Sequence, residues 1–157
     1  MLNINATWAN PIELLDGSGR NLIYRISDLS RVPETAGVYV FARRYGSNVV
    51  PLYIGETLNL RKRLEEHLDN VSIMKGIENA SSRGKRLYLF ARVQTKRGQN
   101  INKVLDVLQR ALIEHALSVG HDLLNVQLTK TKLHKIKFEG NRTSEKLFTR
   151  TMLVGGS

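Results

Sequence analysis

A helix-forming stretch near the middle of the chain carries two side chains that could address a phosphate. Arg63 and His67 are four residues apart, so on a helix they face the same side. The basic residues just before them, Arg61 and Lys62, each have a glutamate at the same spacing, whereas Arg63 meets a histidine. A guanidinium without an acidic partner can bind an anion such as a phosphate. A purely structural arginine explains the spacing equally well.

An acid in an apolar sequence is the second candidate for chemistry. Glu114 stands within ALIEHAL, and carboxylates are rarely buried unless they are paired or bind a metal. A contact with Arg110, one turn earlier, would give Glu114 a structural role. In the alternative, Glu114 binds Mg²⁺, which needs only one or two protein carboxylates when water and a substrate phosphate complete its shell.

Local patterns predict the scaffold that would position these side chains. Residues 37–43 and 49–54 alternate as strands do and are rich in Val, Tyr and Phe, with a turn at 45–48 between them. They therefore predict a hairpin that carries Tyr39 and Tyr53. A helix over 60–68 is expected next, with Asn59 as its N-cap and leucines along one face.

The second half of the chain predicts fewer elements. A Gly/Ser/Lys-rich stretch reads as a loop, and a long apolar stretch ended by Gly120 reads as a core helix. The expected elements are a loop over 75–85, a strand over 87–94, a helix from Asn100 or Asn102 to about Val119, and a short strand near 134–138 followed by a basic tail.

Composition narrows the class of protein. The chain has 157 residues, which suits a single domain over 1–157, and no cysteine, which excludes disulfides and thiolate metal sites. It has no apolar run near the roughly 20 residues of a membrane span and no secretory signal pattern, so we expect a cytoplasmic protein with no membrane partner. The net charge of +10 favours nucleic acid as the partner.

The positive charge is concentrated in the second half of the chain. Residues 79–105 carry basic side chains and no acidic one, and basic residues also outnumber acids over 126–157. Such asymmetry is typical of a binding face. The nucleic-acid-binding residues that these stretches predict are Arg83, Lys85, Arg86, Lys96, Arg97, Lys130, Lys132, Lys135 and Lys137.

Taken in order, the motifs resemble the GIY-YIG nuclease family. Gly-Val-Tyr ends at Tyr39, Leu-Tyr-Ile-Gly places Tyr53 fourteen residues later, Arg63 follows ten residues after that, and LIEHAL…LLN comes last. The resemblance covers roughly residues 35–126. It implies an α+β fold with a small three-stranded antiparallel sheet flanked by helices, and extensions over 1–30 and 127–157.

The resemblance also implies a catalytic role for each matched residue. Tyr39 would help to deprotonate the attacking water, and Tyr53 would line the same site. Arg63 would hold and neutralise the scissile phosphate, and His67 would assist the nucleophile. A tyrosine is a weak base at neutral pH, so we expect the metal or a cationic Arg63 or His67 to lower its pKa.

The remaining matched residues concern the metal and the scaffold. Glu114 would bind Mg²⁺, with Mn²⁺ as a substitute, Asn125 would tie down the site, and Gly55 would let the backbone turn tightly beside the phosphate. The implied activity is metal-dependent hydrolysis of double-stranded DNA by a monomer or a homodimer. Two other hypotheses stay open: a nucleic-acid-binding protein on the same fold without turnover, and an RNA-directed nuclease.

Overall fold

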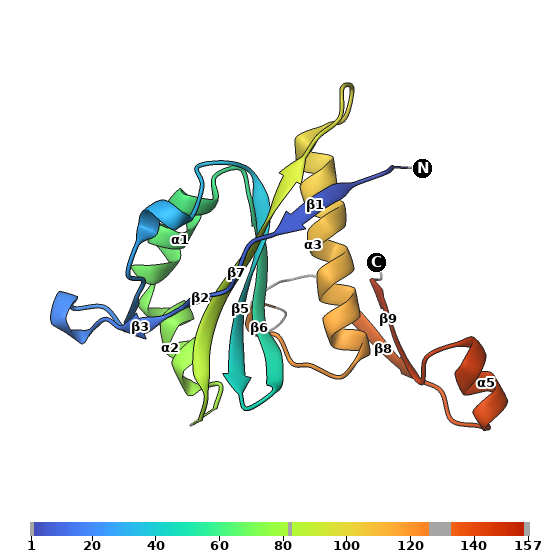
Figure 1. Cartoon of the computed structure of the whole chain (residues 1–157). Helices are drawn as coiled ribbons and strands as arrows, with labels where there is room; N and C mark the ends of the chain where they lie inside the picture. Colours follow the sequence, from blue (N-terminus) through green and yellow to red (C-terminus); the bar gives the residue numbers. More distant parts are fainter. Residues whose placement is uncertain (1, 82, 126–132, 156–157) are drawn as a thin grey trace.

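The protein is built around one antiparallel sheet, so the predicted α+β class is confirmed. At its centre β5 (Gly37–Tyr45) lies between β6 (Asn48–Thr57) and β7 (Lys85–Gln94), as Figure 1 shows. The structure, a computed structural model, describes residues 2–81, 83–125 and 133–155.

Amino-terminal strands extend this sheet beyond the three strands that were predicted. β1 (Asn5–Trp8) and β2 (Ile12–Glu13) both pair with the outer edge of β7, which makes five strands. β1 exposes all four of its residues and β2 is only two residues long, so neither gives an alternating pattern to detect. The rest of this segment forms short elements: β3 (Leu15–Asp16), η1 (Ser18–Arg20), β4 (Tyr24–Arg25) and η2 (Leu29–Arg31).

The predicted hairpin and helix are both confirmed. β5 and β6 pair in a register that sets Tyr39 opposite Gly55, with a bulge after Phe41. α1 (Leu60–Leu68) begins where the Asn59 side chain accepts a hydrogen bond from the Lys62 amide. This N-cap satisfies an otherwise free helix donor.

A second helix replaces part of the predicted loop. α2 (Val71–Asn79) begins at Asn70, whose side chain accepts a hydrogen bond from the Ile73 amide, and it buries Met74 and Ile77. The prediction of a loop over 75–85 is therefore wrong for 75–79. Gly and Asn weaken the helical signal of this stretch, but burial of two large apolar side chains outweighs their low propensity.

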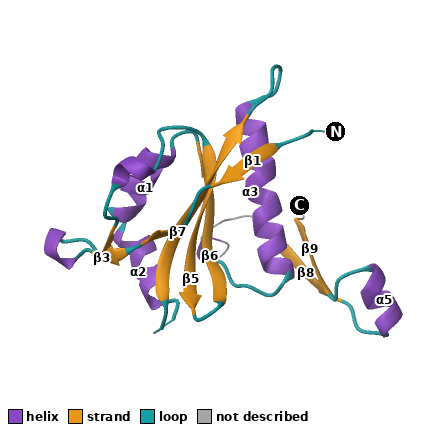
Figure 2. Ribbon diagram, in the orientation of Figure 1, coloured by secondary structure: helices purple, strands orange, loops and turns teal. Residues whose placement is uncertain are grey.

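Helices cover the two faces of the sheet (Figure 2). α1 and α2 pack on the face that carries Tyr39 and Phe41. α3 (Ile101–Ser118), capped by Asn100, packs on the other face, where Ala116 contacts the cluster around Ile54. β6 is the edge strand between these two layers, and it is this edge that positions the candidate site.

The carboxy-terminal segment forms a separate hairpin. β8 (Leu133–Lys137) pairs with β9 (Thr151–Gly155), and α5 (Arg142–Leu147) lies between them in the chain. The short strand predicted near 134–138 is confirmed. In the described part of the chain, no helix is both long and apolar enough to cross a membrane.

Arg86 has a structural role that its charge did not reveal. Only 5% of the residue is exposed. Its guanidinium donates to the carbonyls of Ile77 at 2.9 Å, Gly84 at 3.0 Å, Arg83 and Glu78 at 3.1 Å, and Ser81. These are carbonyls at the end of α2 and in the loop after it, which lack helical partners. The prediction that Arg86 binds nucleic acid is wrong, because its donors are already occupied.

Removing the Arg86 guanidinium should therefore destabilise the fold. We expect Arg86→Met to lower the free energy of unfolding by about 3 kcal/mol, because buried carbonyls lose charged hydrogen-bond donors. Urea denaturation followed by circular dichroism measures the loss. Arg92→Met is the matched control, since Arg92 is exposed on the same strand. Equal effects of the two substitutions would contradict the structural role.

Candidate active site

A hydrogen bond between Tyr39 and His67 lies at the centre of the candidate site. The Tyr39 hydroxyl is 2.6 Å from His67 Nε2. Tyr39 comes from the middle of β5, and His67 comes from the last turn of α1, on the side that also buries Leu60 and Leu64. The residues are 3% and 6% exposed, respectively. The cap at Asn59 therefore fixes the helix phase that turns His67 toward the sheet.

Gly55 makes room for this hydrogen bond. A Cβ atom on Gly55 would stand 2.2 Å from the Tyr39 hydroxyl and 2.3 Å from the ring carbon that bears it. Real atoms do not approach so closely, so the Tyr39 ring can cross β6 only where a side chain is missing. We expected Gly55 to allow a tight turn beside a phosphate; instead, it lies in a regular strand and leaves space for Tyr39.

Tyr53 completes an aromatic cluster around the pair. Its ring lies nearly parallel to Tyr39, with centroids 6.3 Å apart, and meets His67 edge-on at 5.3 Å. Tyr53 is half-buried, whereas Tyr39 is buried. Tyr53 is therefore the more accessible of the two tyrosines.

Burial keeps this cluster uncharged near neutral pH. Desolvation, assisted by the nearby Arg63 charge, lowers the pKa of His67 to about 4. Desolvation also raises the pKa of Tyr39 and that of Tyr53, and the opposing effect of Arg63 is smaller. We had expected a cationic His67 to help to lower the tyrosine pKa. The structure contradicts this, because His67 is neutral where the tyrosines are protonated.

Arg63 stands at the edge of this cluster and faces solvent. Its guanidinium is 3.3 Å from the Glu66 carboxylate in an exposed pair, so the sequence-based view that Arg63 lacks an acidic partner and faces His67 is wrong. Arg63 still acts electrostatically on both tyrosines. It also lines an open groove of about 350 Å³, whose walls are Glu56, Thr57, Leu58, Asn59, Lys62, Arg63, Glu66 and Asn102.

Besides Glu66, a further carboxylate near Arg63 comes from a position that the motif did not mark. Glu56 follows the Tyr-Ile-Gly motif directly, and its pKa is raised by desolvation and by Asp106 of α3, while Arg63 lowers it. Glu56 and Asp106 therefore lie close enough to repel each other. Two carboxylates are a sufficient protein ligand set for Mg²⁺ or Mn²⁺ where water and other oxygen ligands complete the shell. Among the described residues, no three potential ligand side chains gather into a complete metal site.

Glu114 does not lie with these groups. It is exposed, and Arg110 pairs with Asp106 at 3.6 Å rather than with Glu114. On α3, Gln109 donates to the Ile54 carbonyl of β6 at 3.4 Å, and Ala116 packs against the Ile54 side chain. Glu114 lies five residues further on, roughly 140° around the helix from Gln109. The structure thus points the predicted metal ligand away from the strand that carries Tyr53.

Asn125 ties the segment after α3 to the free edge of β6. Its side chain accepts a hydrogen bond from the Ile54 amide at 3.3 Å and donates one to the Ile54 carbonyl at 2.7 Å. A carboxamide offers both a donor and an acceptor, so it pairs with an edge strand as another strand would. Asn125 therefore holds the backbone between Tyr53 and Gly55.

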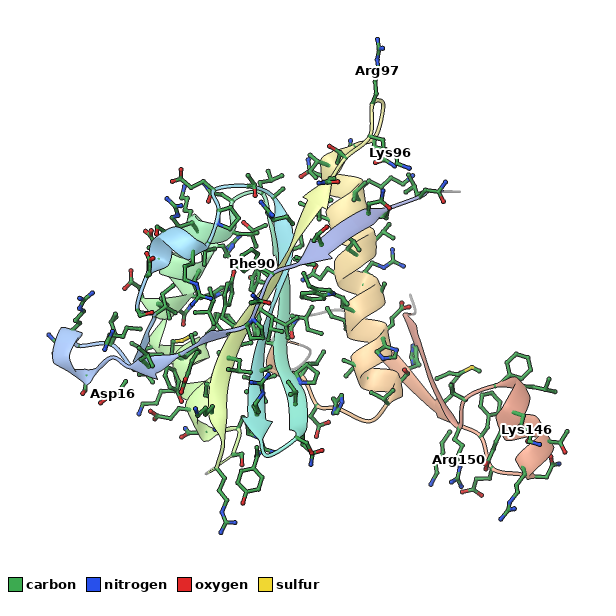
Figure 3. The ribbon with its side chains drawn as sticks, viewed as in Figure 1. Asp16, Phe90, Lys96, Arg97, Lys146 and Arg150 are labelled. Atoms are coloured by element: carbon green, nitrogen blue, oxygen red, sulfur yellow. The ribbon has the colours of Figure 1, made fainter. Side chains whose placement is uncertain are left out.

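The predicted basic residues occupy several parts of the surface. Lys96 and Arg97 project from the turn between β7 and α3, as Figure 3 shows, and Arg83 and Lys85 lie at the opposite end of β7. Lys137 is exposed and Lys135 belongs to β8. Lys130 and Lys132 fall outside the described residues. The prediction overlooked Arg44 and Tyr45, although a turn flanked by Arg-Arg-Tyr was visible in the sequence.

Comparison of the chain with models of known protein families, with curated proteins and with solved structures finds no match.

Adding a methyl group at Gly55 should displace Tyr39. We expect Gly55→Ala to lower the free energy of unfolding by about 1–3 kcal/mol, which is typical of overpacking a tight site. Thermal melting measures it. Gly19→Ala is the control, because a Cβ there meets no atom within 4 Å. If both variants have the melting temperature of the wild type, the close contact of Tyr39 with Gly55 is not present in solution.

The buried neutral His67 should make stability depend on pH. Its pKa is near 4 in the folded chain and about 6.5 when unfolded. Below pH 6.5 the unfolded chain binds a proton that the folded chain rejects, so stability falls from pH 6.5 toward 4. Relative to His67→Gln, the wild type should lose on the order of 3 kcal/mol over this window. Urea denaturation of both proteins between pH 4 and pH 7 measures this loss. The same pH dependence of the free energy of unfolding in both proteins would refute a buried neutral His67.

Proposed function

We propose that the protein is a divalent-metal-dependent nuclease that hydrolyses DNA phosphodiester bonds at the groove beside Tyr39, Tyr53 and His67. The observation that carries the proposal is the 2.6 Å hydrogen bond between the Tyr39 hydroxyl and His67 Nε2 beside the exposed Arg63. A buried hydrogen-bonded pair next to a solvent-exposed guanidinium suits a reaction in which water attacks an anionic centre.

The Tyr39–His67 pair would take up the proton of the attacking water. With its own proton on Nδ1, neutral His67 accepts the hydrogen bond from the Tyr39 hydroxyl. Tyr39 can then accept a proton from water as it passes its own to His67, and His67 would release that proton to solvent, because burial lowers its pKa to about 4. No buried phenolate has to persist, which matters because burial raises the pKa of Tyr39. Water oxygen bonds to phosphorus, the bond to the leaving sugar oxygen breaks, and that oxygen takes a proton from solvent.

Arg63 would bind the scissile phosphate. Its pair with Glu66 is exposed on both sides, with side chains 46% and 50% accessible. Such surface pairs contribute little to stability, so a phosphate can replace Glu66 at low energetic cost. A guanidinium also matches two phosphate oxygens at once.

The divalent ion would be held by Glu56 and Asp106. When bound, it would offset the negative charge that builds on the phosphate and the leaving oxygen. It would also relieve the repulsion between the two carboxylates that contributes to the raised pKa of Glu56. The positions of these side chains support them over Glu114, which is exposed on another side of α3.

Two observations support the alternative of a binding protein without turnover. On α3, the amide of Gln109 contacts β6, and an amide is a weak ligand for a divalent ion compared with a carboxylate. Glu114 is directed elsewhere. Cleavage assays separate the two functions. Competition between matched DNA and RNA duplexes, with cleavage as the readout, tests whether RNA is the preferred substrate.

Cleavage of supercoiled plasmid with Mg²⁺, and with EDTA as the metal-free arm, tests the proposal. We expect Arg63→Ala, Glu56→Gln and Asp106→Asn to lower the cleavage rate at least about 100-fold, because each removes a group that stabilises charge in the transition state. Discrete linear products would indicate cutting of both strands, and nicked circles would indicate cutting of one.

Glu114→Gln is the matched control, since it neutralises an acid on the same helix as Asp106. It should cleave as the wild type does. Loss of cleavage in Glu114→Gln, with Glu56→Gln and Asp106→Asn unaffected, would return the metal to Glu114. Salt-sensitive DNA binding without cleavage by the wild type would favour the binding protein.

A further inference from the structure

A cluster of cations at the far end of the central sheet is not explained by folding. In the pairing of β5 with β7, Arg43 lies opposite Arg86 and Arg44 lies opposite Lys85. Like charges directly opposite one another destabilise a sheet. The guanidinium of Arg86 is stabilised by its five carbonyl partners. Arg44 and Lys85 instead stay exposed at the strand ends.

Acidic side chains do little to balance this cluster. Within the described part of the chain, one ion pair reaches it, between Lys85 and Glu13 at 3.7 Å, and both side chains are exposed. Arg43 donates to the Arg83 carbonyl and Arg83 to the Tyr45 hydroxyl, so these guanidinium groups hold the surface in place. A cluster that keeps like charges together in a formed surface has the character of an anion site.

The same cations surround a hollow of the right shape. An open hollow of about 510 Å³ is lined by Arg44, Tyr45, Gly46, Gly84 and Lys85. Tyr45 is 49% exposed, so its ring is available as a contact surface. A wide, basic hollow with an accessible aromatic ring fits the sugar–phosphate backbone of a nucleic acid. An enclosed small-molecule site would be deeper and more apolar.

We infer that this hollow is a second phosphate-binding subsite, in which Arg44 and Lys85 grip the backbone of the same DNA duplex that enters the groove at Arg63. The inference rests on the proposed function for the identity of the duplex. It adds a contact that lies away from the reacting bond, since the β5–β6 turn is at the other end of the strands from α1 (Figure 1).

The spacing of the two sites sets the length of DNA that they cover. Six residues separate Tyr39 from Tyr45 on β5, and a strand rises about 3.3 Å per residue, so the hollow lies about 20 Å from the Tyr39–His67 pair. Duplex DNA rises about 3.4 Å per base pair. For a duplex that runs along β5, the hollow holds phosphates about six base pairs from the bond that is cut.

Duplex binding in EDTA, where cleavage does not interfere, tests the subsite with the full chain. Fluorescence anisotropy measures the Kd for a duplex of about 20 base pairs, which is about three times the spacing between the hollow and the Tyr39–His67 pair. The measurement is repeated across a range of salt concentrations. We expect the double variant R44A/K85A to weaken binding about tenfold and to reduce the slope of log Kd against log salt by about two, one for each lost phosphate contact. The double variant R20A/R31A removes the same charge from η1 and η2 and should keep the wild-type slope.

The outcomes distinguish this inference from the proposed function. If R44A/K85A keeps the wild-type slope while Arg63→Ala weakens binding, the second subsite is refuted and the groove at Arg63 stands. If R44A/K85A and R20A/R31A lose the same DNA affinity and salt slope, the effect comes from net charge alone, and the subsite is also refuted. If no form binds the duplex, both the subsite and the DNA nuclease function fail. Binding of anionic lipid vesicles that is lost in R44A/K85A, with DNA binding unchanged, would assign the hollow to a membrane surface instead.

Discussion

The architecture of the candidate site depends on a missing side chain. Because Gly55 has no Cβ, the Tyr39 ring can cross β6 and bring its hydroxyl to His67. A buried phenol needs a hydrogen-bond partner, and a neutral imidazole supplies one without placing a charge in the interior. The contact also sets how closely α1 approaches the sheet. The register of the β5–β6 hairpin and the orientation of α1 therefore together set the geometry of the Tyr39–His67 pair.

The edge of β6 joins the two faces of the sheet at the point where chemistry would occur. Tyr53 faces α1, while Ile54 faces α3, and the Ile54 backbone is held by the carboxamides of Asn125 and Gln109. The peptide next to Tyr53 is therefore held from α3 and from the segment that follows it.

The sequence predicted the local elements well and the long-range ones poorly. The hairpin and α1 follow from alternation, a cap and a leucine stripe, all of which act within a few residues. The tie from Asn125 to β6 matches its motif. The side of α3 that faces the sheet could not be predicted, because apolar residues occupy more than half of its circumference. The sequence therefore indicated Glu114 as the α3 residue of the site, whereas Gln109 is the polar α3 residue that contacts β6. Arg86 was assigned to the surface because charge alone does not show that carbonyls surround it.

The pairing of the amino-terminal strand with β7 has a consequence for the order of assembly. Asn5 lies opposite Gln94, so the two paired strands are far apart in sequence, with β2, β5 and β6 between them in the chain. During synthesis β1 leaves the ribosome first, yet it can join only after β7 has been made. Long sequence separation slows such pairing, whereas β5 and β6 meet through a two-residue turn. The hairpin that carries the tyrosines can therefore form early, and the first residues of the chain close the sheet last.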